Sequence, residues 1–302
     1  MDKYPFYRTL TIHELAQRAD KAWAMLKACN LCPRQCGVDR TSGERGYCKT
    51  GDRAFVSSWG PHMGEERPIT GHYGSGTIFF GNCNLGCKFC QNWEISHEGE
   101  GAEMTEKDLS EVMLELQTRR CHNINLVTPT HQMPMILRAL VYAVERGLEI
   151  PIVYNCGGYE SLEALRLLEG IVDIYMPDLK FADSDVSMKW ADAPDYFQRA
   201  KVAIKEMHRQ VGNLVIQKGI ARRGLLIRHL VLPEGLAGTK EIARFIACEV
   251  SPNTYVNVME QYYPCYRAKG DTVLGRRITR QEYMSAIEAM IDAGIRWHTD
   301  AD

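Results

Sequence analysis

The chain has 302 residues, of which 45% are hydrophobic, and 36 basic against 38 acidic residues leave a net charge of −2. This composition supports a sizeable core and provides no basic surface for nucleic acid. No segment approaches the roughly 20 apolar residues of a membrane span, so neither nucleic acid nor a membrane is expected as a partner. The N-terminus lacks the apolar core of a signal peptide. The eleven cysteines therefore predict metal ligands in a reducing cytoplasm rather than disulfides.

The first predicted element is an amphipathic helix over residues 11–28, with Thr11 and Glu14 as its capping box. We expect this helix to cover one end or edge of a sheet, because an exposed edge invites unwanted pairing. A cysteine-rich loop follows it. We assign residues 1–70 to this N-terminal extension and residues 71–302 to the core.

Six short apolar runs, partly β-branched, predict buried parallel strands over residues 77–81, 123–128, 151–155, 172–176, 225–232 and 255–259. Helical patterns lie between and after them, at about 105–120, 132–147, 160–169, 194–211, 239–250 and 280–294. The first of these helices opens at Thr105, with Asp108 three residues on. Strands that alternate with helices build a parallel sheet. The chain is therefore predicted to be an α/β protein, a partial (β/α)6 barrel of the TIM type with a cysteine-rich N-terminal extension.

Three cysteines, Cys83, Cys87 and Cys90, follow the first predicted strand with the spacing C-x3-C-x2-C. Three thiolates cannot saturate the four irons of a [4Fe-4S] cluster, whereas electron-transfer ferredoxins supply a fourth cysteine. One iron would therefore stay open to a small-molecule ligand. A pair of cysteines alone more often marks zinc or a redox dithiol. Three at this spacing, with Phe89 before the last, are far more specific.

This spacing resembles that of the radical S-adenosylmethionine (SAM) enzymes. In those enzymes the open iron binds the amino and carboxylate groups of SAM, and one electron from the cluster cleaves SAM to a 5′-deoxyadenosyl radical. The resemblance implies a [4Fe-4S] cluster on Cys83, Cys87 and Cys90, with SAM as the second cofactor.

Polar residues follow the predicted strands where barrel enzymes place their chemistry, at the carboxyl ends. Asp178 and Lys180 are two residues apart on an extended segment, so that an anion and a cation point toward one ligand. Arg228 and His229 face opposite sides of their strand, and a buried arginine requires an anionic partner. The candidates for a cofactor site are Thr128, Thr130, Asn155, Asp178, Lys180 and Arg228.

The cluster loop, Asp-Leu-Lys after the fourth strand and Arg-x-x-Val-Leu-Pro on the fifth resemble the pyruvate formate-lyase activating enzymes over about residues 29–295. The leading cysteines and the run Gly-Ser-Gly-Thr-Ile-Phe-Phe resemble an uncharacterised branch beside them. The resemblance implies that Phe89 lies against the adenine and that Lys180 neutralises the SAM carboxylate. It also implies that Asp178 and Asn155 hold a monovalent cation, and it favours Arg228 as the residue that faces the lumen.

The chain departs from that family in two loops. After the second strand the family carries Gly-Gly-Glu, which receives the SAM ammonium, whereas this chain has Thr128-Pro129-Thr130. Hydroxyls and carbonyls can accept the same hydrogen bonds, but without the negative charge. After the sixth strand the family presents a histidine, whereas this chain has Gln261-Tyr262-Tyr263.

A second group of cysteines lies in the N-terminal loop, with the spacing C-x2-C-x3-C-x11-C. Closed coordination by four thiolates suits structural zinc or a second [4Fe-4S] cluster. The spacing matches neither the zinc ribbon nor the bacterial ferredoxin run, so both metals remain open. The residues concerned are Cys29, Cys32, Cys36 and Cys48.

These patterns together predict a radical SAM enzyme that removes a hydrogen atom from its substrate. The resemblance implies the glycine of a glycyl-radical enzyme as that substrate, and a flavodoxin- or ferredoxin-type protein as electron donor. An alternative is radical modification of a small molecule or peptide, with Arg228 binding a carboxylate. A non-catalytic iron-sulfur electron-transfer protein is a third interpretation, against which the open iron and the full barrel argue.

Overall fold

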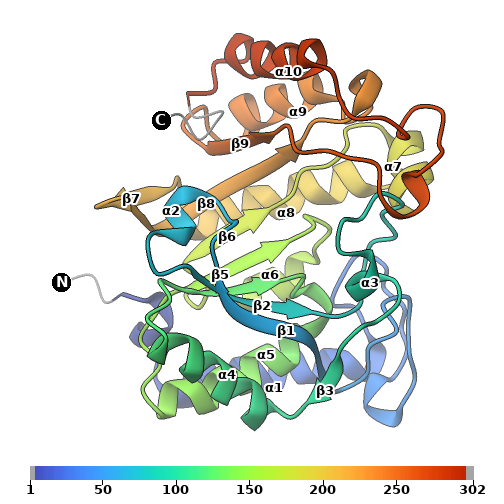
Figure 1. Ribbon diagram of the computed structural model, residues 1–302. Coiled ribbons are helices and arrows are strands. Elements are labelled where there is room, and N and C mark those ends of the chain that lie inside the picture. Colours follow the sequence, from blue (N-terminus) through green and yellow to red (C-terminus); the bar gives the residue numbers. More distant parts are fainter. Residues whose placement is uncertain (1–3, 297–302) are drawn as a thin grey trace.

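A parallel sheet forms the centre of the computed structural model, which describes residues 4–296 (Figure 1). Residues 1–3 and 297–302 of the predicted domains lie outside the described residues. Within residues 4–296 six strands run parallel, in the order β2 (Ser75–Phe80), β4 (Ile124–Val127), β5 (Ile152–Cys156), β6 (Ile174–Pro177), β8 (Ile220–Leu230) and β9 (Tyr255–Met259). These are the six predicted strands, and the prediction of an α/β partial barrel is confirmed.

Helices follow the strands as predicted and cover the outer face of the sheet (Figure 1). The capping box at Thr105 forms with Asp108. The last part of the predicted helix 239–250 is a π-helical turn over Ile246–Val250. The helices are α4 (Glu106–Thr118), α5 (Met133–Glu145), α6 (Leu162–Leu167), α8 (Tyr196–Val211), α9 (Thr239–Phe245) and α10 (Arg280–Asp292).

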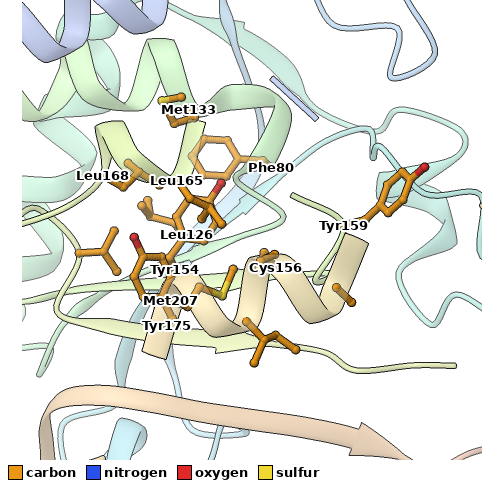
Figure 2. Close-up of a cluster of buried hydrophobic side chains, with 14 of the residues drawn as sticks. Phe80, Leu126, Met133, Tyr154, Cys156, Tyr159, Leu165, Leu168, Tyr175 and Met207 are labelled. Atoms are coloured by element: carbon orange, nitrogen blue, oxygen red, sulfur yellow. The ribbon is translucent and has the colours of Figure 1, made fainter. Parts of the chain in front are cut away.

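The main core lies between the outer face of the sheet and these helices. Figure 2 shows Leu126, Tyr154 and Tyr175 from the strands packed with Leu165 and Met207 from the helical layer. Alternate residues of a strand point to opposite faces. The side chains between these core residues, such as Val153 and Asn155, therefore face the lumen.

The N-terminal helix α1 (Ile12–Ala24) begins with the predicted capping box but does not cover the sheet edge, so that prediction was wrong. It packs on α5 and α6 through a buried stripe that includes Leu15, Ala19 and Ala22. The edge at β2 pairs instead with the antiparallel strand β1 (Ala54–His62), which in turn pairs with β3 (Ala102–Met104). An edge needs backbone hydrogen-bond partners, and a strand supplies them whereas a helix does not.

The segment before residue 71 also fills the lumen. Ile69 in α2 (Arg67–Thr70) is fully buried in a second apolar cluster with Val153, Ile174, Leu226 and others from β5, β6 and β8. Residues 54–70 thus pack as part of the barrel, although we had assigned them to the extension. Since α2 occupies one end of the lumen, the carboxyl ends of the strands are left for a binding site.

Shorter elements surround that end. They are α3 (Trp93–Ser96), α7 (Ser184–Ala191) and the hairpin strand β7 (Val215–Gln217), which pairs with the start of β8. Among the described residues, no helix combines the length and hydropathy needed to cross a membrane.

Candidate active site at the carboxyl end of the barrel

A cavity of about 260 Å³ opens at the carboxyl ends of the parallel strands. The three cysteines of the C-x3-C-x2-C loop line it together with the charged residues that follow β6. Every residue predicted for the catalytic centre lines this cavity except Thr130. The residues concerned are Cys83, Cys87, Phe89, Cys90, Thr128, Asn155, Asp178, Lys180 and Arg228.

The cysteine loop is held by backbone contacts. The N–H groups of Gly86 and Lys88 donate to carbonyls at the end of α7, at 2.9 and 2.8 Å. The N–H of Leu85 lies 3.3 Å from the Sγ of Cys83. Burial raises the pKa of Cys87 to about 12, although Lys180 opposes this. Iron binding would therefore release protons from this loop as the thiolates form.

A network of partly buried charges occupies the floor of the cavity. The Nζ of Lys180 donates to Asp178 Oδ2 at 2.5 Å, and the Nε of Arg228 donates to Asp178 Oδ1 at 2.8 Å. Burial opposes ionisation of Asp178, but the two cations hold its pKa below the ordinary value. Burial likewise opposes the charge on Lys180, and Asp178 more than offsets it, so the pKa of Lys180 is raised. The predicted pair is thus a partly buried ion pair and not a solvated surface bridge.

Arg228 has its anionic partners within the protein. Its Nη2 donates to Asn155 Oδ1 at 2.7 Å, and its Nη1 lies 3.5 Å from Glu65 Oε2. The oxygens of Asp178 and Asn155, which the resemblance assigned to a monovalent cation, therefore bind a guanidinium. The structure gives no support to that cation, because Arg228 already supplies the positive charge at the same oxygens.

The segment that carries Asp178 and Lys180 is fixed from behind by Tyr196. Its hydroxyl accepts a hydrogen bond from the Lys180 N–H at 3.0 Å. The same oxygen lies 2.8 Å from the Asp178 carbonyl and 2.9 Å from the Gly157 carbonyl. Tyr196 is fully buried, so the two charged side chains project from a rigid backbone.

Thr128 lines the cavity with an unusual backbone. Its φ is +62°, in the left-handed region that β-branched residues rarely adopt. Thr128 stands where the resembled family has the first glycine of Gly-Gly-Glu, and a glycine would adopt this φ without strain. Strain retained beside a cavity is a reason to look for a functional role of the side chain.

Thr130 points elsewhere. It is 1% exposed, and its hydroxyl donates to Glu160 Oε1 at 2.6 Å. The cause is local: a short 3-10 helix over Thr130–Gln132 begins directly after the strained turn and directs the side chain away from the cavity. Its position gives no support to the predicted contact with the cofactor.

Two residues near the cavity were missed by sequence reasoning. Glu65 precedes α2 and reaches Arg228 from the opposite end of the lumen. His97, at the end of α3, lines the cavity, with Nε2 3.0 Å from the Cys87 carbonyl. The His97 ring stacks on Tyr266, with the ring centroids 4.6 Å apart, and Trp93 stacks on the same tyrosine. Neither residue follows a parallel strand, so the strand-end rule could not find them.

Residues 77–223 match the family model of the radical SAM superfamily. This segment is a radical SAM superfamily domain. Such a domain implies a [4Fe-4S] cluster and SAM, and the residues fit both, because the radical SAM cysteine loop and a partly buried lysine line one cavity.

Two relatives come from Methanocaldococcus jannaschii. Uncharacterized protein MJ0674 is 33% identical over 274 residues, which cover 87% of this chain and 74% of that protein. Uncharacterized protein MJ0808 is 28% identical over 171 residues, which cover 50% of this chain and 49% of that protein. A radical SAM methyltransferase from Sphaerobacter thermophilus has a TM-score of 0.52 at 15% identity, with 74% of this chain and 65% of that chain covered. This last similarity concerns the fold alone.

Proposed function

We propose that this radical SAM protein is an enzyme that cleaves SAM reductively and removes a hydrogen atom from a substrate. When bound, the cluster and SAM supply a one-electron cleavage of the sulfonium to methionine and a 5′-deoxyadenosyl radical. The observation that carries the proposal is that Cys83, Cys87 and Cys90 line the same cavity as the cation Lys180. Superfamily membership of residues 77–223 supports it.

Three residues that line the cavity have roles in this proposal. Lys180 receives the SAM carboxylate, because it is a cation held at the cavity surface by Asp178. Thr128 offers a hydroxyl to the SAM ammonium, as the aligned carboxylate of the resembled family is absent. Phe89 packs edge-on against Phe181, with ring centroids 5.9 Å apart, and provides an apolar wall for the adenine.

The substrate that we favour is a glycine of a glycyl-radical enzyme, with a flavodoxin- or ferredoxin-type protein as electron donor. The resemblance to the pyruvate formate-lyase activating enzymes supports this choice. Modification of a small molecule or peptide is the alternative. This alternative loses the residue that was expected to bind a substrate carboxylate, because Arg228 already contacts Asp178, Asn155 and Glu65. A glycyl residue carries no charge and needs no such anchor.

Anaerobic reconstitution with iron and sulfide tests the proposal. The wild-type protein should form 5′-deoxyadenosine from SAM under reduction, and a variant with Cys83, Cys87 and Cys90 replaced by alanine should form none. The control is Cys248→Ala, which alters an exposed cysteine remote from the cavity lining. Cofactor cleavage that survived the triple change would refute the function. A glycyl-radical EPR signal on mixing with a candidate partner enzyme would identify the substrate class, and its absence would favour the alternative.

A further inference from the structure

The four N-terminal cysteines come together around a second cavity. Cys29, Cys32, Cys36 and Cys48 all line it, although 19 positions separate the first from the last. Backbone bonds shape the loop, since the Cys29 N–H donates to the Val38 carbonyl and the Gly37 N–H to the Cys29 carbonyl, both at 3.0 Å. The residue before Tyr47 must be glycine, because a Cβ at Gly46 would lie 2.8 Å from the Cys36 Sγ.

Arg40 brings a buried positive charge to this cavity. It is 1% exposed, and its Nε and Nη1 donate to the carbonyls of Gly51 and His131, both at 2.9 Å. Its Nη1 also lies 4.0 Å from Cys29 Sγ. These carbonyl partners are neutral, whereas a buried cation requires a negative charge nearby. Thiolates at the cysteines would provide that charge.

The cavity wall also contains polar atoms without partners. His131 lines it and is 1% exposed, and its Nε2 must donate to the Gly81 carbonyl at 2.9 Å. The other ring nitrogen, Nδ1, has no hydrogen-bond partner within residues 4–296. The Nη2 of Arg34, on the same wall, is buried and equally without a partner. A buried N–H such as that of Arg34 costs free energy when it lacks an acceptor, and sulfur atoms of thiolates or of a cluster would supply one.

Zinc and a cubane require different arrangements of the ligand sulfurs. In a tetrahedral zinc site the sulfurs lie about 2.3 Å from one ion and hence roughly 4 Å from each other. In the described part of the chain no three His, Cys, Asp or Glu side chains converge on a single ion in this way. The same is true of Cys83, Cys87 and Cys90, which line their cavity just as the N-terminal cysteines line theirs. A cubane places an iron at each cysteine and so does not require four sulfurs around one ion.

We propose that Cys29, Cys32, Cys36 and Cys48 hold a second [4Fe-4S] cluster, which passes single electrons to the catalytic cluster. Arg34 links the two sites, since its Nε donates to the Asn84 carbonyl at 3.1 Å, and Asn84 lies directly beside Cys83. Asn84 also lines the N-terminal cavity. The relay rests on the proposed function, whereas the metal site itself does not.

The electron balance of the relay is simple. A reduced flavodoxin or ferredoxin-type donor gives one electron to the N-terminal cluster, which changes from the 2+ to the 1+ state. That cluster returns to 2+ as the catalytic cluster accepts the electron. No proton or atom moves in this step.

The metal site is tested in the variant in which Cys83, Cys87 and Cys90 are alanine, since this leaves the N-terminal loop intact. Anaerobically prepared protein should contain about four irons and four sulfides per chain, with a [4Fe-4S] EPR signal after reduction. Further replacement of Cys32 should remove the iron, whereas Cys248→Ala should not. About one zinc per chain, or freely alkylated thiols without metal, would overturn the site. None of these readouts requires SAM cleavage, so they are independent of the proposed function.

The relay is tested in Cys36→Ala by EPR of the catalytic cluster. Cys36 is the ligand that is not fully buried, so this variant is the least disruptive of the four. Dithionite should still reduce the catalytic cluster, but a reduced flavodoxin should do so far more slowly than in the wild type. Equal rates with flavodoxin in a variant that lacks the N-terminal iron would overturn the relay and leave the cluster assignment standing.

Discussion

Replacement of Lys180 by methionine removes one positive charge from the cavity while Asp178 keeps its second partner. Arg228 remains 2.8 Å from Asp178 Oδ1, so the buried carboxylate is not left unpaired. Methionine retains the length and most of the volume of the lysine stem. The variant therefore probes the interaction of the ammonium with SAM more than the stability of the barrel.

The expected loss follows from the environment of Lys180. A hydrogen bond to a charged group contributes about 1.5–3 kcal/mol. The Lys180 side chain is 20% exposed, and Asp178, 2.5 Å away, already neutralises part of its charge. Both effects reduce the contribution, so we expect SAM affinity to fall by about 1–2 kcal/mol, which is roughly five- to thirtyfold. The ligands of the cluster are untouched.

Equilibrium binding of SAM to the reconstituted protein measures this loss, and the cluster absorption spectrum checks that iron binding is unchanged. The matched control is Lys205→Met, which breaks an ion pair with Glu249 whose side chains are 46% and 45% exposed. Such a surface pair contributes little, so SAM affinity should be unaffected. If Lys180→Met bound SAM as tightly as the wild type, Lys180 would not be the carboxylate partner.

Three further changes test the packing behind the site. Thr128→Gly should raise the free energy of unfolding by up to about 1 kcal/mol, because glycine adopts a φ of +62° without strain; a loss of stability on urea denaturation would contradict this. Tyr196→Phe should lower it by about 1–3 kcal/mol, since the Lys180 N–H loses its acceptor, and unchanged stability would speak against the contact. Burial raises the pKa of Asp173 to about 7. The stability that Asp173 contributes should be fully present below about pH 4 and lost as the pH rises through 7. The free energy of unfolding should change by roughly 4 kcal/mol over this range. Urea titrations of Asp173→Asn should show a flatter pH dependence, and an unaltered profile would exclude Asp173 as the cause.

The parallel strands could be predicted because each is buried on both faces and reads as an apolar run. β1 could not. Of its residues only Ala54 and Val56 are buried, and Gly60 and Pro61 near its end are typical of a turn. Its place in the sheet depends on pairing with β2, from Val56 opposite Phe80 to His62 opposite Ser75. No local pattern contains that information.

The same distinction applies to the site. Asn155, Asp178 and Arg228 were expected to meet because the carboxyl ends of neighbouring parallel strands lie side by side. Glu65 was not expected there, since it precedes α2 and reaches Arg228 from the opposite end of the lumen. Thr130 was misjudged because one strained residue, Thr128, turns the chain before it. The position of a side chain two residues beyond a strand depends on backbone angles that residue type alone does not fix.

The contacts of Arg228 determine how the charges around the cavity are paired. Asp178 and Glu65 bring two carboxylates to the lumen, and Lys180 and Arg228 bring two cations. Arg228 contacts both carboxylates and Asn155, so its positive charge is already paired within the protein. Lys180 has Asp178 alone among these groups and lies at the cavity surface. In the function that we propose, the network would therefore direct one cation toward the SAM carboxylate and leave the SAM ammonium to neutral acceptors such as Thr128, in the loop where this chain departs from the family that it resembles.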